Sequence, residues 1–139
     1  MRVLTGTLIF IVAFAFNATA FDMPWAAKKE DPNKKTNAIY RKALGAYGMA
    51  DYAKAIKLTT DTVTMDPKFA KGYALRGKAK KDMGDVDGAV TDLNKALGLD
   101  PNLGEAYYVR AQVSEIMGEM DKAKADYAKG CKAGYRDAC

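Results

Sequence analysis

The sequence predicts an all-α fold, a right-handed α-solenoid of three stacked helix-turn-helix units, and two observations lead to this prediction. Two stretches of the sequence align when Pro67 is placed on Pro101, "TMDPKFAKGYALRGKAKKDMGDVDGAV" and "GLDPNLGEAYYVRAQVSEIMGEMDKAK". We call this offset of 34 residues one repeat period. Within each stretch, apolar and small residues recur at helical spacing, and glycine or proline stands where each helix should end. Such a period is an internal repeat, and helix pairs that cannot bury their apolar faces alone are expected to stack.

The repeat is carried by six pairs of matching positions. These are Tyr73 and Tyr107, Arg76 and Arg110, Gly77 and Ala111, Gly84 and Gly118, Ala89 and Ala123, and Asp92 and Asp126. The glycines at 84 and 118 predict the turn between the two helices of a unit.

Small residues are expected where the two helices of a unit meet, since a large side chain there would hold them apart. The first helices carry Ala43, Gly77 and Ala111, and the second helices carry Ala55, Ala89 and Ala123. We therefore predict that all six positions are buried.

These features resemble the tetratricopeptide repeat. That family has a helix-turn-helix of about 34 residues with an aromatic residue early in the first helix, a small residue one turn later, a glycine turn, an alanine in the second helix and a closing proline. The stretch "YALRGKAKKDMGDVDGAVTDLNKALGLDP" is similar to a common bacterial variant. The resemblance implies a repeat domain over residues 36–139, with units at about 36–69, 70–103 and 104–139.

The first and third units depart from this pattern. In the first, the turn reads "GMAD" with Gly48 two positions early, and Thr59 and Thr62 replace the expected aromatic residue and alanine. A bent or loosely packed first helix pair is therefore expected. In the third, Tyr135 replaces the closing proline, and Gly130 stands where the second unit has an alanine.

The N-terminus predicts export. Arg2 precedes a continuous apolar core, and the core is followed by the small-residue triplet "ATA" that ends at Ala20. This pattern is typical of a secretory signal peptide over residues 1–20, cleaved after Ala20. The alternative is an uncleaved membrane anchor, because the apolar stretch approaches the roughly 18 to 20 residues that span a bilayer.

Residues 21–35 are charged and contain proline, and they predict a flexible lead-in to the repeats. Trp25, the only tryptophan, either docks on the first helix pair or contacts a partner. An exported protein of this kind is expected in the periplasm, with secretion or membrane anchoring as alternatives.

The composition argues against catalysis. The chain has no histidine, so it lacks the commonest general base and the commonest transition-metal ligand. It also lacks a glycine-rich phosphate loop and cysteines at metal-ligand spacing. We predict no enzymatic activity, cofactor or metal; an enzyme would need Glu105 or Glu115 to act alone.

The resemblance implies that the first helices line a concave groove that receives a peptide. The implied groove residues are Tyr40, Leu44, Tyr47, Lys71, Lys78, Lys81, Tyr108, Gln112 and Glu115. Aromatic residues beside lysines suit a protein or peptide partner with an acidic segment and a large apolar anchor; alternatively, the lysines form an ordinary solvated face. The net charge of +5 is spread along the chain and does not indicate nucleic-acid binding. The carboxylate clamp of some chaperone adaptors needs asparagine where Leu44 stands, so we do not expect that clamp.

The predicted function is thus a noncatalytic, exported protein-interaction module. The alternative is a membrane-tethered scaffold or assembly subunit with an uncleaved N-terminal helix. The arginine and aspartate that recur together in the second and third units are interpreted as structural ion pairs, with a ligand-binding arginine ladder as the functional alternative.

The only two cysteines, Cys131 and Cys139, lie in the C-terminal stretch "GCKAGYRDAC". This stretch is similar to cysteine-rich Sel1-like repeats, which implies a disulfide that staples the tail onto the last helix. On one continuous helix the two Cα atoms would lie about 12 Å apart, beyond the roughly 7 Å limit for a disulfide. The chain must therefore turn if they are to pair, and Gly134 is the expected position. The alternative is two free thiols on a frayed tail.

Overall fold

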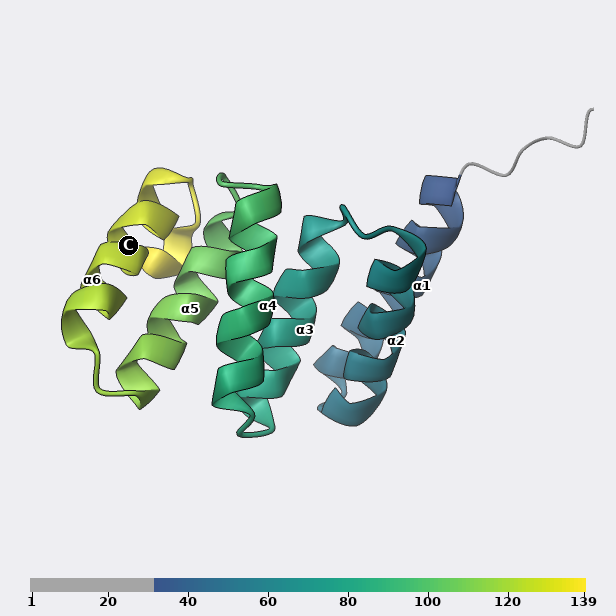
Figure 1. Cartoon of the computed structure of the whole chain (residues 1–139), viewed down its shortest axis with the longest axis horizontal. Coiled ribbons are helices and arrows are strands. Elements are labelled where there is room, and N and C mark those ends of the chain that lie inside the picture. Colours follow the sequence, from purple (N-terminus) through teal and green to yellow (C-terminus); the bar gives the residue numbers. More distant parts are fainter. Residues whose placement is uncertain (1–31) are drawn as a thin grey trace, which may run out of the picture.

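The computed structural model describes residues 32–139, which form six α-helices and one short 3-10 helix (Figure 1). The elements are α1 (Pro32–Gly48), α2 (Tyr52–Met65), α3 (Ala70–Asp82), α4 (Val86–Leu99), α5 (Gly104–Ile116), α6 (Met120–Lys132) and η1 (Arg136–Ala138). No strand occurs within this part of the chain. The predicted all-α helical-repeat solenoid is confirmed. The predicted signal peptide and Trp25 lie outside the described residues.

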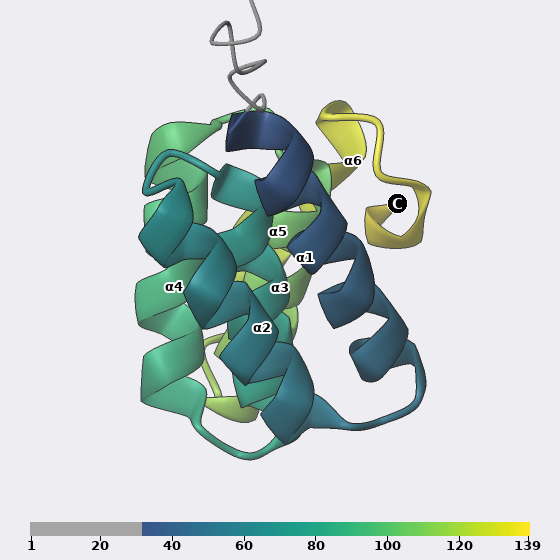
Figure 2. The ribbon, with the colours of Figure 1, turned by 90° about the vertical axis from the view of Figure 1, so that its right-hand side faces the viewer.

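The helices pack as three consecutive pairs along the long axis of the molecule (Figure 1). Turned by 90°, the molecule shows α2 and α4 on one flank, with α1 on the other (Figure 2). α3 contacts both α1 and α5. The first helices of the units therefore form one layer, and we call the exposed side of α1, α3 and α5 the first-helix face.

The first helix begins earlier than the sequence predicted. α1 starts at Pro32, so the end of the predicted lead-in, 32–35, is helical. Proline is well suited to the first helical position because its fixed φ matches the helix and its missing N–H would have had no partner there. α3 and α5 begin at Ala70 and Gly104, where the second and third units were predicted to begin.

The helices of each unit meet through the small residues that the repeat placed there. All six predicted contact positions, Ala43, Gly77, Ala111, Ala55, Ala89 and Ala123, are buried. A Cβ atom added to Gly77 would lie 3.2 Å from the Ala89 carbonyl oxygen and 3.0 Å from the Leu93 side chain. The two backbones are thus so close that even a methyl group at Gly77 would force a neighbour to move.

The first helix pair is not loosely packed at its two threonines, contrary to expectation. Thr59 and Thr62 are fully buried. The Thr59 hydroxyl donates to the Ala55 carbonyl oxygen at 2.7 Å, and the Thr62 hydroxyl donates to the Leu58 carbonyl oxygen at 2.8 Å. Each hydroxyl is therefore satisfied within α2, and the polar residues can be buried without an unpaired group.

The turn of the first unit contains strain that the turns of the other units lack. Gly84 and Gly118 take the left-handed conformation, with φ of 85° and 76°. Ala50, one repeat period before Gly84, takes φ of 59° at the same place. A residue with a Cβ atom is destabilised by about 1 kcal/mol or more in this conformation.

Replacing Ala50 with glycine should therefore stabilise the fold. The expected gain in the free energy of unfolding is about 0.5 to 1 kcal/mol, because the greater freedom of glycine in the unfolded chain offsets part of the relief. Urea unfolding followed by circular dichroism measures it. Gly84→Ala is the matched control and should lower stability; a destabilised Ala50→Gly variant would contradict the assignment of strain.

Ala89→Leu should overpack the second helix pair. Because Ala89 is completely buried, the larger side chain should cost about 1 to 3 kcal/mol of unfolding free energy. Ala128→Leu, at an exposed position of α6, is the control and should change stability little. Equal melting temperatures for the two variants would argue against the tight contact.

Candidate partner-binding surface

The predicted groove residues lie on α1, α3 and α5, and several of them contact one another across unit boundaries. The Lys78 ammonium lies 5.0 Å from the centre of the Tyr47 ring. The same ammonium forms an ion pair with the Glu105 carboxylate at 2.8 Å. One side chain from each of the three first helices thus meets at Lys78.

A second set of contacts runs beside the first. Lys81 donates to the Gln112 side-chain oxygen at 2.9 Å and pairs with the Asp82 carboxylate at 3.0 Å. Asp82 also accepts the hydroxyl hydrogen bond of Tyr47. Burial, followed by this hydrogen bond, raises the pKa of Tyr47.

These contacts change the electrostatic picture drawn from the sequence. Of the three lysines, Lys78 and Lys81 are held by partners from α3 and α5. Lys71 is exposed and makes no hydrogen bond or ion pair within residues 32–139. The positive charge of these three lysines is therefore partly neutralised by carboxylates of the same protein, and alignment of the repeats could not show this.

The α1 end of the surface is aromatic and apolar. The Tyr40 ring packs edge-on against Phe69 at 5.1 Å, measured between ring centres. Burial raises the pKa of Tyr40 to about 12. Leu44, one helical turn further on, is 43% exposed. Sequence reasoning missed Phe69, which stands immediately before α3, although Leu103 before α5 was a signal for an apolar residue at that position.

The α5 end of the surface is a cluster of three tyrosines. The Tyr108 ring lies 5.8 Å from Tyr127 and 5.2 Å from Tyr135, measured between ring centres. Glu115 accepts a hydrogen bond from the Tyr127 hydroxyl at 2.9 Å. Burial and then this hydrogen bond raise the pKa of Tyr127 to about 12. The sequence had placed Tyr108 and Glu115 on the surface, but not the two tyrosines that contact them.

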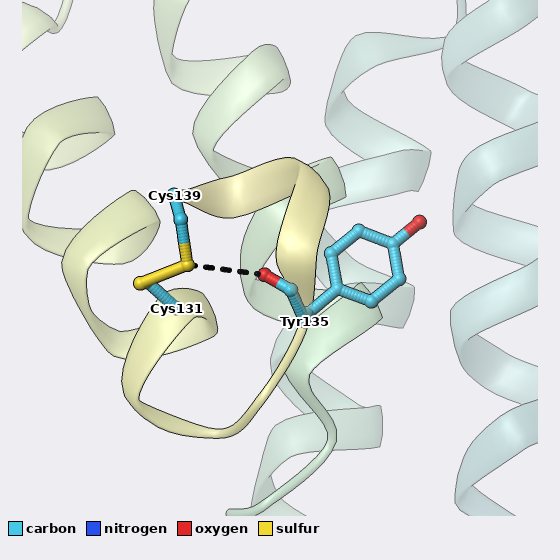
Figure 3. Close-up of a disulfide and its surroundings, with 3 residues drawn as sticks. All are labelled: Cys131, Tyr135 and Cys139. Carbon is cyan, nitrogen blue, oxygen red and sulfur yellow. Dashed lines mark hydrogen bonds between the residues drawn. A yellow bond between two sulfur atoms is a disulfide. The ribbon is translucent and has the colours of Figure 1, made fainter.

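Tyr135 belongs to the C-terminal tail, and the disulfide of the tail holds it in this cluster. Cys131 and Cys139 form a disulfide with a Cα–Cα distance of 4.9 Å (Figure 3). The chain turns back after α6 at Gly134, with φ of 86°. A Cβ atom added to Gly104 would lie 2.8 Å from the Tyr135 Cβ, so the tail packs tightly on the start of α5. The disulfide implied by the sequence resemblance is present.

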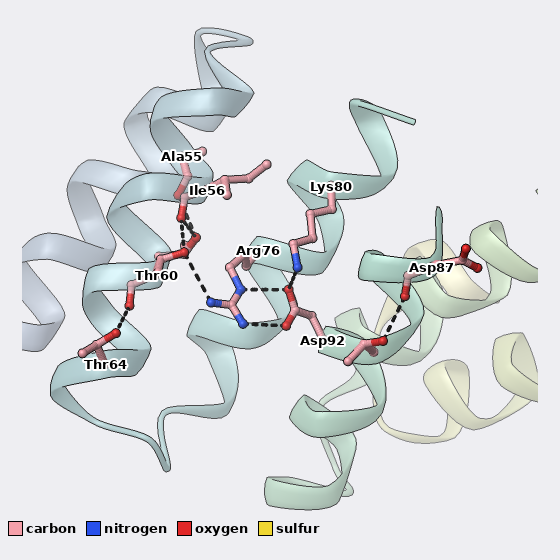
Figure 4. Close-up of polar contacts among 10 residues, drawn as sticks. Ala55, Ile56, Thr60, Thr64, Arg76, Lys80, Asp87 and Asp92 are labelled. Atoms are coloured by element: carbon pink, nitrogen blue, oxygen red, sulfur yellow. Dashed lines mark hydrogen bonds and ion pairs between the residues drawn. The ribbon is translucent and has the colours of Figure 1, made fainter. Parts of the chain in front are cut away.

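The repeated arginines do not belong to the first-helix surface contacts. Arg76 donates two hydrogen bonds to the Asp92 carboxylate, of 2.8 and 2.7 Å (Figure 4). Arg110 donates two hydrogen bonds to the Asp126 carboxylate in the same geometry, of 2.7 and 2.8 Å. These hydrogen bonds raise the pKa of both guanidinium groups. The interpretation as structural ion pairs within each unit is confirmed.

The described residues contain neither a candidate metal site nor a candidate membrane-spanning helix. Between 32 and 139, no group of three or more acidic or cysteine side chains could hold a metal ion. In that range, too, no helix combines the length and the apolar character needed to cross a bilayer. The carboxylates Glu105 and Glu115 each have a partner, Lys78 and Tyr127.

Comparison with known families matches residues 70–103 and 104–133 to the tetratricopeptide repeat. Tetratricopeptide repeats are thus supported in these two units. Among curated proteins, none matches the sequence significantly. The first helix pair lies outside the family match, and the similarity of the tail to Sel1-like repeats stays a prediction.

Solved structures show the same fold across more of the chain. The Arabidopsis OM64 tetratricopeptide domain is 22% identical with a TM-score of 0.69, over 73% of this chain and 84% of that domain. The first such domain of Spaghetti (RPAP3), bound to the HSP90 peptide SRMEEVD, is 20% identical with a TM-score of 0.68, over 76% and 90%. The TPR2B domain of yeast Sti1, in complex with pHsp70, is 24% identical with a TM-score of 0.68, over 72% and 80%.

Breaking the disulfide by Cys139→Ser should free the tail. The small ring accounts for about 2.5 kcal/mol of stability by loop entropy, and this is an upper figure because the tail can detach without unfolding of the helices. Amide hydrogen exchange should show faster exchange at Tyr135 and Ala138, with little change in α3. The bridge itself is checked by treating the purified protein with an alkylating reagent in the absence of reductant. Two unlabelled cysteines would verify the disulfide, whereas two labelled cysteines would contradict it.

Proposed function

We propose that this protein is a noncatalytic, exported interaction module whose first-helix face binds a peptide or protein partner. The observation that carries the proposal is that side chains of all three units meet on this face, where Lys78 of α3 lies over the Tyr47 ring and pairs with Glu105 of α5. Tyr40 and Leu44 lie on α1 and Tyr108 lies on α5 of the same face. Tyrosine and leucine contribute apolar area, and the tyrosine hydroxyls add hydrogen bonding. The similar structures that contain an HSP90 peptide and pHsp70 support this use of the fold.

The proposed partner carries an acidic segment and a large apolar anchor. Lys71 provides an unpaired ammonium group on the described surface. The Lys78–Glu105 pair is only partly buried, so a carboxylate from a partner can exchange with Glu105 at modest cost. Leu44 is exposed beside Tyr40, and this apolar area suits the anchor.

Export is supported by two features at opposite ends of the chain. Residues 1–20 have the signal-peptide pattern. The Cys131–Cys139 disulfide is expected to persist in an oxidising compartment such as the periplasm. The proposed interaction therefore occurs outside the cytoplasm, with another envelope protein as the partner class.

Lys71→Glu and Leu44→Ala test the surface without breaking any contact described above. Affinity capture from the envelope fraction, followed by mass spectrometry, should identify the partner with the parent protein. Each variant should then weaken binding at least about fivefold, the effect of losing about 1 kcal/mol at a binding contact.

Lys95→Glu, an exposed charge reversal on α4, is the control and should bind like the parent. If Lys71→Glu and Leu44→Ala also bind like the parent while their circular dichroism is unchanged, the first-helix face is not the binding surface. The intact mass of the captured protein tests export: loss of residues 1–20 supports it, and their retention supports the membrane-tethered alternative.

A further inference from the structure

Away from the first-helix face, a hollow opens between α4, α5 and α6. Its volume is about 410 Å³. Its walls combine apolar and polar side chains, among them Val90, Arg110, Ser114, Met117, Ala125 and Asp126. The Asp126 side chain, although charged, is only 8% exposed.

The second unit shows what occupies the corresponding place there. Asp92 aligns with Asp126 and is held by Arg76 in the same two-bond geometry. A second cation, the Lys80 ammonium, reaches the Asp92 Oδ2 atom at 2.9 Å (Figure 4). One buried carboxylate thus binds a guanidinium and a primary ammonium together.

In the third unit, Arg110 donates the same two hydrogen bonds to Asp126, but no lysine takes the place of Lys80. Ser114 follows Lys80 by one repeat period and therefore stands in its position. The Ser114 residue is 6% exposed and lines the hollow. Its hydroxyl makes no hydrogen bond within the described residues 32–139. The short side chain leaves open the space that a lysine side chain fills one unit earlier.

We propose that this hollow binds a primary ammonium group carried on a short alkyl chain. The ammonium takes the position that Lys80 holds in the second unit and binds Oδ2 of Asp126, while the alkyl chain packs against Val90, Met117 and Ala125. A lysine side chain of another protein and a free alkyl diamine share this chemistry. The site is independent of the function proposed for the first-helix face.

Lys122, Lys129 and Glu119 also line the hollow, and neither lysine pairs with Asp126 within residues 32–139. The Lys122 side chain is 69% exposed and pairs with Glu119 at 2.7 Å. The Lys129 ammonium lies 5.8 Å from the centre of the Tyr107 ring. Lys95 stands at the position of Lys129 in the second unit, where the Lys80 ammonium is nevertheless accommodated.

The first unit provides a comparison within the same chain. It has a hollow of about 290 Å³, in whose wall Leu58 and Ala46 stand at the positions of Asp92 and Lys80, one repeat period earlier. The carboxylate in this wall, that of Asp51, caps α2 by accepting from the Lys54 backbone N–H at 3.1 Å. This hollow has the space for an alkyl chain but no carboxylate at the aspartate position, so it should not select an ammonium.

The probe is Nα-acetyl-lysine-N-methylamide, titrated into the 15N-labelled oxidised protein at constant ionic strength. Saturable amide shifts are expected in α5 and α6 around Ser114 and Asp126. The norleucine analogue has nearly the same chain without the ammonium, and it should bind at least tenfold more weakly. Cadaverine distinguishes the two sources: tighter binding of cadaverine indicates a free diamine, and tighter binding of the lysine amide indicates a protein lysine.

Two variants test the geometry. Ser114→Lys copies the second unit and should weaken binding of the lysine amide at least tenfold. Lys80→Ser should create a second set of shifts around Asp92, and this gain cannot result from misfolding.

Lys124→Gln removes an exposed charge on α6 outside the hollow and should bind like the parent. The proposal is overturned if the norleucine analogue shifts the same amides equally, if Ser114→Lys still binds, or if Lys124→Gln weakens binding as much as Ser114→Lys does.

Discussion

The close approach of the two helices within each unit is the constraint on which the rest of the structure depends. A methyl group on Gly77 would force Leu93 or the Ala89 backbone to shift, and the small residue alanine stands at the corresponding positions of the other units. Because the helix axes are held at a short distance, larger residues such as Leu93 and Val109 can fill the space between neighbouring units. The first helices are then brought side by side, and the side chains of the first-helix face can contact one another across units.

Polar contacts connect the stacked units as well as the helices within them. Arg76 reaches Thr60 of the preceding unit at 3.3 Å, and Arg110 reaches Asn94 at 2.7 Å. Each arginine thus satisfies a buried aspartate in its own unit and contacts the unit before it. A buried carboxylate without its partner is costly. The arginine contacts therefore favour one register of stacking between neighbouring units over its alternatives.

The repeat period predicted the fold and the helix on which each candidate groove residue lies, because a residue's position within the repeat determines which face of its helix it occupies. It could not predict which side chains on that face neutralise one another. The Lys78–Glu105 and Lys81–Gln112 contacts join different columns of neighbouring units, so they depend on how the units stack. For the strain at Ala50, the sequence offered only one sign, a glycine two positions early at Gly48. The helical start at Pro32 was not predicted, because the charged residues around it indicated a flexible segment.

The tail places Tyr135 and Ala138 where the family pattern would begin another helix pair. They follow Pro101 and Gly104 by one repeat period. Ala138 is buried, and a Cβ atom on Gly130 would lie only 2.9 Å from its side chain. A second copy stacking end to end against α6 would therefore have to displace a covalently held segment. As long as the cysteines stay oxidised, the segment 135–139 stays packed on α5 and α6, and reduction of the disulfide would be needed to release this face for stacking.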